Sequence, residues 1–148
     1  MCLSAGPALA FDPPERVAVR GAADAIAWVR TIPGFGFFAE VYALFLSGGA
    51  ATPGDPSGPP VLRRAAWLGA ATALDDFVAW PDFSLGYAPP DGADGVLLVV
   101  CRPGEGVAPT PVDRRVFELL RLAHEARGAP LTDVVLVDGR RWYSMGAG

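Results

Sequence analysis

The sequence predicts a single α/β domain in which helices flank a mixed β-sheet. An uninterrupted apolar run over 96–101 predicts a strand that is covered on both faces. An amphipathic helix over 110–128 follows it, and a strand pair follows the helix. A chain of 148 residues with 51% hydrophobic residues can bury such a core. We expect an extended N-terminal arm over 1–18 and the domain over 19–148.

The first half of the chain predicts one helix and one strand, with one segment left open. Apolar residues at helical spacing predict a helix over 21–32, which ends before Pro33. The β-branched and aromatic residues of 39–49 predict a mostly buried strand. Segment 61–80 is compatible with a helix or with two strands, because alanines and leucines stand beside a glycine and β-forming ends. Prolines and glycines allow only a short helix in 81–95.

The second half contains the clearest start and stop signals. Thr110 predicts an N-cap, a proline follows at the first helical position, and Asp113 stands where a capping box has its acid. Gly128 ends the helix, and Asp138–Gly139 predicts the turn of a hairpin. Apolar residues on one side of the helix predict the buried stripe: Val112, Val116, Leu119, Leu120, Ala123 and Ala126.

Composition excludes several classes of protein. All twelve basic residues are arginine, so no lysine can serve a P-loop or a Schiff base, and a net charge of −4 argues against nucleic-acid binding. Cys2 and Cys101 do not form a disulfide framework, and no segment is long and apolar enough for a membrane span. The first residues lack the basic start of a signal peptide. We therefore expect a soluble cytoplasmic protein.

Other chemical motifs are weak. The acidic loop Gly104–Gly106 lacks the lysine of a phosphate loop, and Ser47 precedes two glycines without forming the G-x-S-x-G pattern of a nucleophile elbow. The single histidine, His124, is expected in packing or at the surface, and Cys101 as a small buried hydrophobe. The segment "PGFGFF" at 33–38 places three phenylalanines in a turn, which would mark a partner site if they are exposed.

One spacing pattern carries a family resemblance. Residues 100–103 are Val-Cys-Arg-Pro, and six residues later the chain continues as Thr110-Pro-Val-Asp113. This frame resembles the zinc motif of the JAB/MPN (JAMM) metalloprotease family, His-x-His-Pro followed after six residues by Ser-x-x-Asp, in its bacterial RadC-like branch. The strand "EVYALFLSG" from Glu40 and the tail 128–146 are also similar to RadC-like sequences. The resemblance spans about 40–146 and implies the cytidine-deaminase-like mixed sheet of that family.

The resemblance also implies residue roles. In the family, two histidines and the aspartate hold Zn²⁺ with a bound water, a glutamate is the general base and the serine stabilises the oxyanion. Here Glu40 would keep the base, Asp113 the third ligand and Thr110 the hydroxyl. Val100 and Arg102 occupy the two histidine positions, so the zinc motif is degenerate.

No other residue replaces the lost ligands. His124 lies eleven residues after Asp113 on the expected helix, roughly 16 Å away at 1.5 Å per residue. Cys101 would point to the opposite face of its strand from Arg102. We therefore expect Arg102 to stand in for the zinc ion and to bind the carboxylates of Glu40 and Asp113.

These residues also have plainer interpretations. Thr110 and Asp113 are sufficient as a helix cap, Glu40 as an exposed strand-edge acid, and Arg102 as a solvated strand end.

The expected function is a catalytically inactive RadC-like JAB/MPN domain that acts as a protein-interaction or scaffold module, a pseudoenzyme without a cofactor. We expect a protein partner or self-association, and neither nucleic acid nor membrane. Two alternatives stay open. The first is a zinc-dependent isopeptidase or peptidase whose metal site is non-standard or completed by another chain. The second is an unrelated small α/β binding domain.

Overall fold

The computed structural model describes residues 10–13, 16–48, 59–70, 93–126 and 128–146. Within these ranges the chain forms a single mixed sheet with two helices. The elements are β1 (Ala10–Phe11), α1 (Ala22–Val29), β2 (Glu40–Ser47), β3 (Val61–Ala70), β4 (Gly95–Cys101), α3 (Pro111–Glu125), β5 (Leu131–Asp138) and β6 (Arg141–Ser144).

The six strands follow one another across the sheet in the order β1-β3-β2-β4-β5-β6. Only β4 and β5 are parallel, and α3 is the crossover that connects them. The other neighbours are antiparallel, and β5 and β6 form a hairpin. The fold is therefore α/β with a mixed sheet, as expected.

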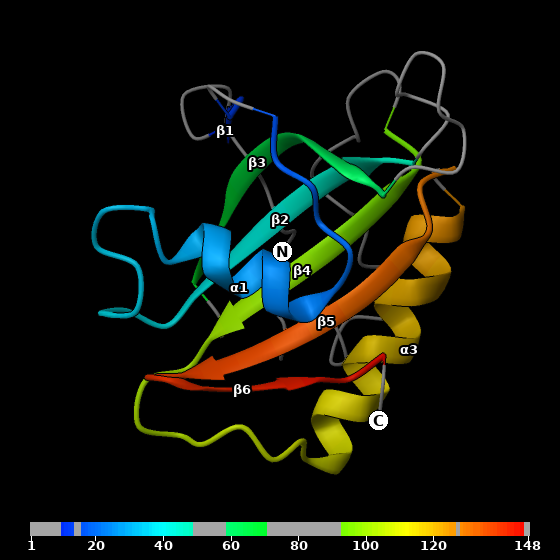
Figure 1. Ribbon diagram of the computed structural model, residues 1–148. Helices are drawn as coiled ribbons and strands as arrows, with labels where there is room; N and C mark the ends of the chain where they lie inside the picture. The colour runs from blue at the N-terminus through cyan, green and yellow to red at the C-terminus, as the bar shows by residue number, and fades with distance from the viewer. Residues whose placement is uncertain (1–9, 14–15, 49–58, 71–92, 127, 147–148) are drawn as a thin grey trace.

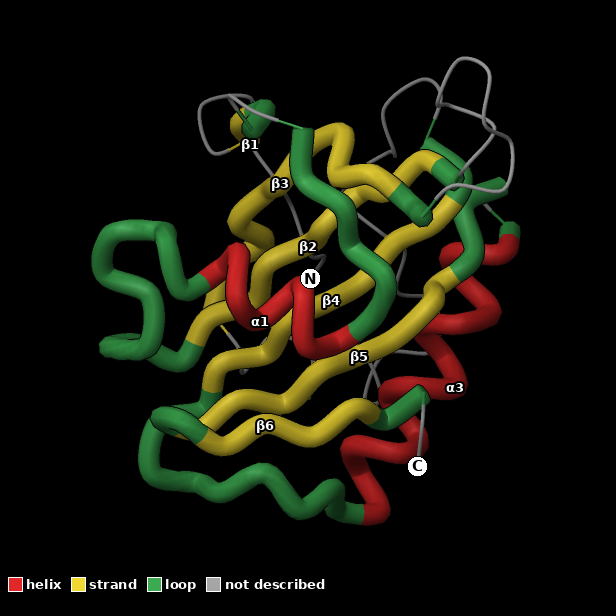
Figure 2. The backbone as a smooth tube through the Cα atoms, viewed as in Figure 1, coloured by secondary structure: helices red, strands yellow, loops and turns green. Residues whose placement is uncertain are grey.

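A helix covers each face of the sheet, as Figure 1 shows, with α1 in front of the strands and α3 behind them. Side chains that alternate along the central strands divide into two hydrophobic clusters. The α3 side holds Val41, Leu98, Val100 and Leu136, whereas the α1 side holds Tyr42, Leu44, Leu97 and Val99. The tube in Figure 2 shows α1 and α3 on opposite faces of the sheet.

Helix α3 begins and ends as its sequence predicts. The Thr110 side chain accepts from the backbone N–H of Asp113, the Asp113 side chain accepts from the Thr110 N–H, and a proline opens the first turn. Gly128 follows the helix with a φ of 79°, a conformation that glycine adopts without strain.

The predicted buried stripe of α3 is correct only in part. Val116 and Leu120 are buried, and Leu119 and Ala123 are partly buried, but Val112 is 48% exposed. Val112 lies in the first turn, directly after an exposed proline, and Ala126 after the last turn is exposed as well. His124 takes a stripe position, with none of its surface exposed, and its Nδ1 hydrogen-bonds the carbonyl of Leu120 at 2.8 Å.

The other segments agree with the predictions or refine them. Helix α1 ends at Val29, before the predicted 32, because the Thr31 hydroxyl and the N–H groups of residues 31 and 32 turn back onto the last carbonyls. Segment 61–80, for which the sequence allows a helix or two strands, begins with a strand over 61–70. Residues 71–80 and most of 81–95 lie outside the described residues.

The boundary predicted at residue 18 does not separate two structural units. Strand β1, within the expected arm, pairs with β3, and Ala18 bridges to Val61. Val19 is buried in the cluster on the α1 side. The described part of the arm is therefore extended, as expected, but belongs to the sheet. None of the described helices has the length and apolar character needed to span a membrane.

The contact of α3 with the sheet can be tested at two neighbouring leucines. Leu120 is fully buried, whereas Leu122 is 55% exposed. We expect Leu120→Ala to lower the free energy of unfolding by about 3 kcal/mol, because it removes buried methyl groups and leaves a cavity. The control Leu122→Ala should change it by less than about 0.5 kcal/mol. Urea unfolding of both variants measures the difference, and equal losses would contradict the assigned face of α3.

Candidate functional site

The candidate site begins where β4 ends. All seven residues of β4 are buried, so a charged side chain can follow only after Cys101. The Arg102 backbone continues the ladder by donating to the carbonyl of Val137 at 2.8 Å. A turn closed by the Glu105 N–H on the Arg102 carbonyl then follows. The second residue of this turn is a proline and the third is Gly104, whose φ is 80°. A type II turn favours proline at its second position and requires a positive φ at its third.

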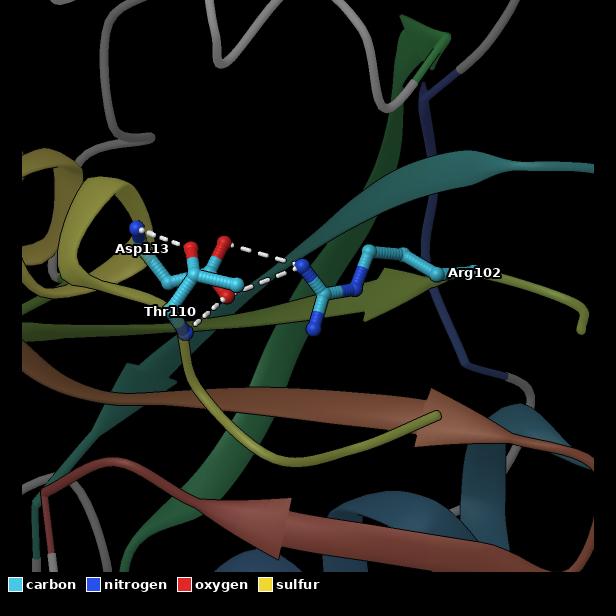
Figure 3. A network of polar contacts seen from close by, with 3 residues as sticks. All are labelled: Arg102, Thr110 and Asp113. Atoms are coloured by element: carbon cyan, nitrogen blue, oxygen red, sulfur yellow. Dashed lines mark hydrogen bonds and ion pairs between the residues drawn. The ribbon is translucent and has the colours of Figure 1, made fainter. Parts of the chain in front are cut away.

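Arg102 extends from this strand end to the first turn of α3, as Figure 3 shows. Its Nη1 donates to both carboxylate oxygens of Asp113, at 2.9 Å to Oδ1 and 3.0 Å to Oδ2. The two side chains are only 15% and 16% exposed, so the ion pair is largely shielded from water. Charge-assisted hydrogen bonds in such surroundings are stronger than those on the surface.

Asp113 has a second role at the helix start. Its Oδ2 also accepts the Thr110 N–H at 2.8 Å, and the Asp113 N–H donates to the Thr110 hydroxyl at 3.1 Å. The carboxylate thus lies between a guanidinium and the positive end of the helix dipole of α3. Both sources of positive charge bind the same carboxylate. Asp113 is therefore a residue of the helix cap and the partner of Arg102 at the same time.

The loop between β4 and α3 is held by Asp138 at the end of β5. The Asp138 carboxylate accepts from the N–H groups of Gly104 at 3.0 Å and Gly106 at 2.8 Å, and it pairs with Arg141 at 3.1 Å. The two backbone N–H groups, followed by Arg141, hold the pKa of Asp138 below its ordinary value. The N–H groups of the two glycines therefore bind a carboxylate of their own chain. This contact accounts for the Gly-x-Gly sequence of the loop, which has no phosphate-binding lysine.

Glu40 lies apart from these residues. The β2–β4 register places it opposite Cys101 and places Val41 opposite Val100, so the Glu40 side chain is on the α1 side of the sheet. There it accepts the Tyr42 hydroxyl at 3.0 Å. Burial and then Glu40 raise the pKa of Tyr42 to about 12, and burial and Glu40 likewise raise the pKa of the Cys101 thiol.

Arg102 therefore binds one of the two acids that the hypothesis assigned to it, Asp113, and does not bind Glu40. Within the described ranges, Arg102 makes no ion pair with Glu40, and its buried Nε has no hydrogen-bond partner. The structure brings together Arg102, Thr110 and Asp113, places Val100 in the core beneath them, and leaves Glu40 on the far face.

This group of residues does not fit a zinc site. Val100 supplies no donor atom, Arg102 is a permanent cation, and the Asp113 oxygens are already occupied. The prospective base, Glu40, faces away from them. Among the described residues, no group of three or more His, Cys, Asp or Glu side chains could hold a metal ion.

A concave region lies between the start of α1 and the β5–β6 edge, with a volume of about 550 Å³. Trp142 forms part of its wall. Asp133 inside it accepts the Ser144 hydroxyl and the Gly146 N–H, and Asp24 accepts the Arg20 N–H at 2.9 Å. Its carboxylates thus already have partners within the chain, which makes them structural.

Sequence reasoning missed two residues of this end of the sheet. Asp138 was predicted only as part of a hairpin turn, although an acid at the end of a strand beside a Gly-x-Gly loop is a signal for such an anchor. Tyr42 lies in the strand expected over 39–49, and nothing local in the sequence shows that its hydroxyl meets Glu40 two residues before it.

The described residues thus define a single-sheet α/β domain. No family model matches the chain, and no curated protein matches it.

A double-mutant cycle tests the Arg102–Asp113 interaction. Arg102→Met removes the cation and Asp113→Asn keeps an acceptor for the helix cap. We expect Arg102→Met to lower the free energy of unfolding by about 2 kcal/mol, because a mostly buried carboxylate loses two charged hydrogen bonds. In the Asp113→Asn background the loss should be smaller by at least about 1 kcal/mol.

The exposed pair Arg121–Glu118 on the same helix is the matched control. Its coupling should be no more than about 0.5 kcal/mol, because water screens it. Urea unfolding measures both cycles, and additive effects at Arg102 and Asp113 would refute their interaction.

The lowered pKa of Asp138 predicts a pH dependence with a definite sign. Its carboxylate stabilises the folded state above the ordinary value of 3.8, and this contribution is lost as pH falls through the lower folded pKa. We expect Asp138→Asn to be less stable than the parent at pH 7, with the difference shrinking as pH falls below 3.8 and through the lowered folded pKa. Hydrogen exchange at Gly104 and Gly106 should also become faster at neutral pH.

Glu105→Gln is the control for Asp138→Asn, because it removes an exposed charge from the same loop. It should leave the exchange of both glycine N–H groups unchanged. A stability difference for Asp138→Asn that stays constant down to pH 2 would show that the anchor is not ionic.

Proposed function

We propose that this chain is a metal-free, catalytically inactive domain of the RadC-like JAB/MPN type, and that it works as a protein-interaction or scaffold module. The observation that carries the proposal is the ion pair between Arg102 and Asp113. It occupies the two positions where the family would have a zinc ligand on the strand and another on the helix. A guanidinium held by the ligand aspartate replaces the charge of a metal without its Lewis acidity.

The surrounding fold is compatible with this proposal. A mixed sheet with a helix on each face is compatible with the cytidine-deaminase-like mixed sheet that the resemblance implies. Thr110 and Asp113 stand in the helix start as the family's serine and aspartate would. The strand end, the turn and the helix start bring residues eleven positions apart to within hydrogen-bond distance.

The position of Glu40 supports inactivity independently of the lost histidines. A general base has to lie within about 3 Å of the proton it removes, or reach it through one water. Glu40 is on the α1 side of the sheet and accepts the Tyr42 hydroxyl, whereas Asp113 is on the α3 side. On the opposite face from Asp113, Glu40 is not placed to activate a water held there, and it departs from the position that the resemblance implies for the base.

Metal content and catalysis test the proposal in the unaltered protein. We expect the protein purified without chelators to contain substoichiometric zinc by mass spectrometry. Neither peptides nor isopeptide-linked substrates should be cleaved, with or without added zinc. Stoichiometric zinc together with cleavage that Glu40→Gln abolishes would overturn the proposal in favour of a metallopeptidase.

A gain-of-function variant tests the family assignment separately. Val100→His combined with Arg102→His places two imidazoles on the α3 side next to Asp113, completing a ligand set of family type. We expect this variant to bind one zinc ion and to gain thermal stability from it. Adding Asp113→Asn should remove the binding. A folded double variant without zinc affinity would refute the resemblance.

A further inference from the structure

Two adjacent phenylalanines are exposed in the loop between α1 and β2. Phe37 is 78% exposed and Phe38 is 67% exposed, more than any other large hydrophobic residue among the described ones. Burying one phenylalanine side chain is worth about 1.5–3 kcal/mol, so leaving two in water forgoes substantial stabilisation. Adjacent exposed aromatics of this kind mark interaction sites more often than isolated apolar residues do.

Contacts of the residues just before the pair hold the loop in place. Phe35 packs against the cluster on the α1 side, with its ring 5.7 Å from that of Tyr42. The Phe37 N–H donates to the carbonyl of Gly34 at 3.4 Å, which closes a turn before the pair. Gly34 and Gly36 have φ values of 82° and 98°, which other residues rarely adopt. The backbone thus positions Phe37 and Phe38 outside the core, while Phe35 stays within it.

Arginines lie at the same end of the molecule. Arg30, at the end of α1, donates to the carbonyl oxygens of Gly139 at 3.3 Å and Arg140 at 3.0 Å, which ties α1 to the β5–β6 turn. Figure 2 shows this turn and the loop before β2 at one end of the sheet. Arg140 and Arg141 are exposed on the turn.

The charges at this end are unbalanced. Arg141 pairs with Asp138, but within the described ranges Arg30 and Arg140 have no carboxylate partner. The nearby acid Glu40 is only partly exposed and accepts the Tyr42 hydroxyl. A protein with a net charge of −4 thus has a locally positive surface beside its most exposed aromatic residues.

We propose that Phe37, Phe38, Arg30 and Arg140 form a docking surface, here called the Phe–Arg surface, for an acidic segment of a partner protein. Apolar side chains of that segment would pack on the two rings, and its carboxylates would bind the guanidinium groups. Aromatic residues and arginine are the types enriched in protein interfaces. This proposal rests on the interaction function proposed above and names the chemistry of its partner.

Other occupants fit these observations less well. A nucleic acid requires more phosphate contacts than two unpaired arginines provide, and the rest of an acidic chain would repel it. A second copy would bring two positive surfaces together if the same surface met itself across a two-fold axis. An acidic polypeptide satisfies the charge and the apolar area at once.

A displayed library of random 12-residue peptides, selected on the immobilised full chain, supplies the probe. We expect enriched sequences to combine aspartate or glutamate with one or two large apolar residues. Synthetic peptides with the enriched sequences are then titrated by fluorescence anisotropy. The double variant Phe37→Ser with Phe38→Ser should weaken binding at least about tenfold, the effect of removing a hot spot.

Charge is tested by Arg140→Glu, whose side chain makes none of the described contacts. It should weaken binding about three- to tenfold, and raising the salt concentration should reduce the affinity of the parent protein. Matched controls on α3 are the double variant Val112→Ser with Leu122→Ser and the single variant Arg115→Glu, all at exposed positions. They should bind the peptides like the parent. Thermal unfolding verifies that each variant is folded.

Several results would overturn the Phe–Arg surface. These are a selection without enriched peptides, enriched peptides without acidic residues, and peptide binding that the serine double variant retains. Self-association in sedimentation that the same variant abolishes would assign the surface to a second copy. Oligonucleotide binding lost in Arg140→Glu would assign it to nucleic acid. The zinc and cleavage measurements above do not depend on this surface, so the two proposals fail separately.

Discussion

The burial of β4 constrains everything around the candidate site. Neighbouring strands flank it on both sides and a hydrophobic cluster covers each face, so its residues have no contact with water. A charge can appear only where the strand ends, and it has to find its partner there. Asp113 is that partner, and it is also the acid of the α3 capping box. One carboxylate thus offsets a guanidinium and a helix dipole that would otherwise repel each other.

The same end of the sheet is fixed by two further carboxylates that act locally. Asp138 holds the turn after β4 through backbone N–H groups, and Glu40 accepts a tyrosine hydroxyl on the other face. Each of the three acids binds donors of its own chain. The arrangement uses acidic residues as structural anchors, and this is the reason that a cluster suggestive of catalysis in the sequence is divided between two faces in the fold.

Local signals in the sequence were sufficient for most of the fold. The proline after Thr110, the apolar run of β4 and the glycine after Asp138 each determine their structure through the nearest neighbours, and all three predictions are confirmed. The pairing of Arg102 with Asp113 was expected from the resemblance, which places both residues at one site. Sequence therefore located the central part of the site.

What could not be predicted depends on register between distant segments. Whether Glu40 stands opposite Cys101 or Val100 is decided by one residue of slip between β2 and β4, and this choice moves the carboxylate from one face to the other. No feature within either strand shows the pairing. The exposure of Val112 and the burial of His124 similarly follow from how α3 lies on the sheet, which helical spacing does not determine.

The buried histidine provides a built-in spectroscopic probe. His124 is the only imidazole in the sequence, so its ring signals in a proton spectrum of the unlabelled protein belong to one residue. Its Nδ1 proton is hydrogen-bonded to Leu120 in the interior, where exchange with solvent requires the layer between α3 and the sheet to open. The lifetime of that single resonance in heavy water would report how often this layer separates.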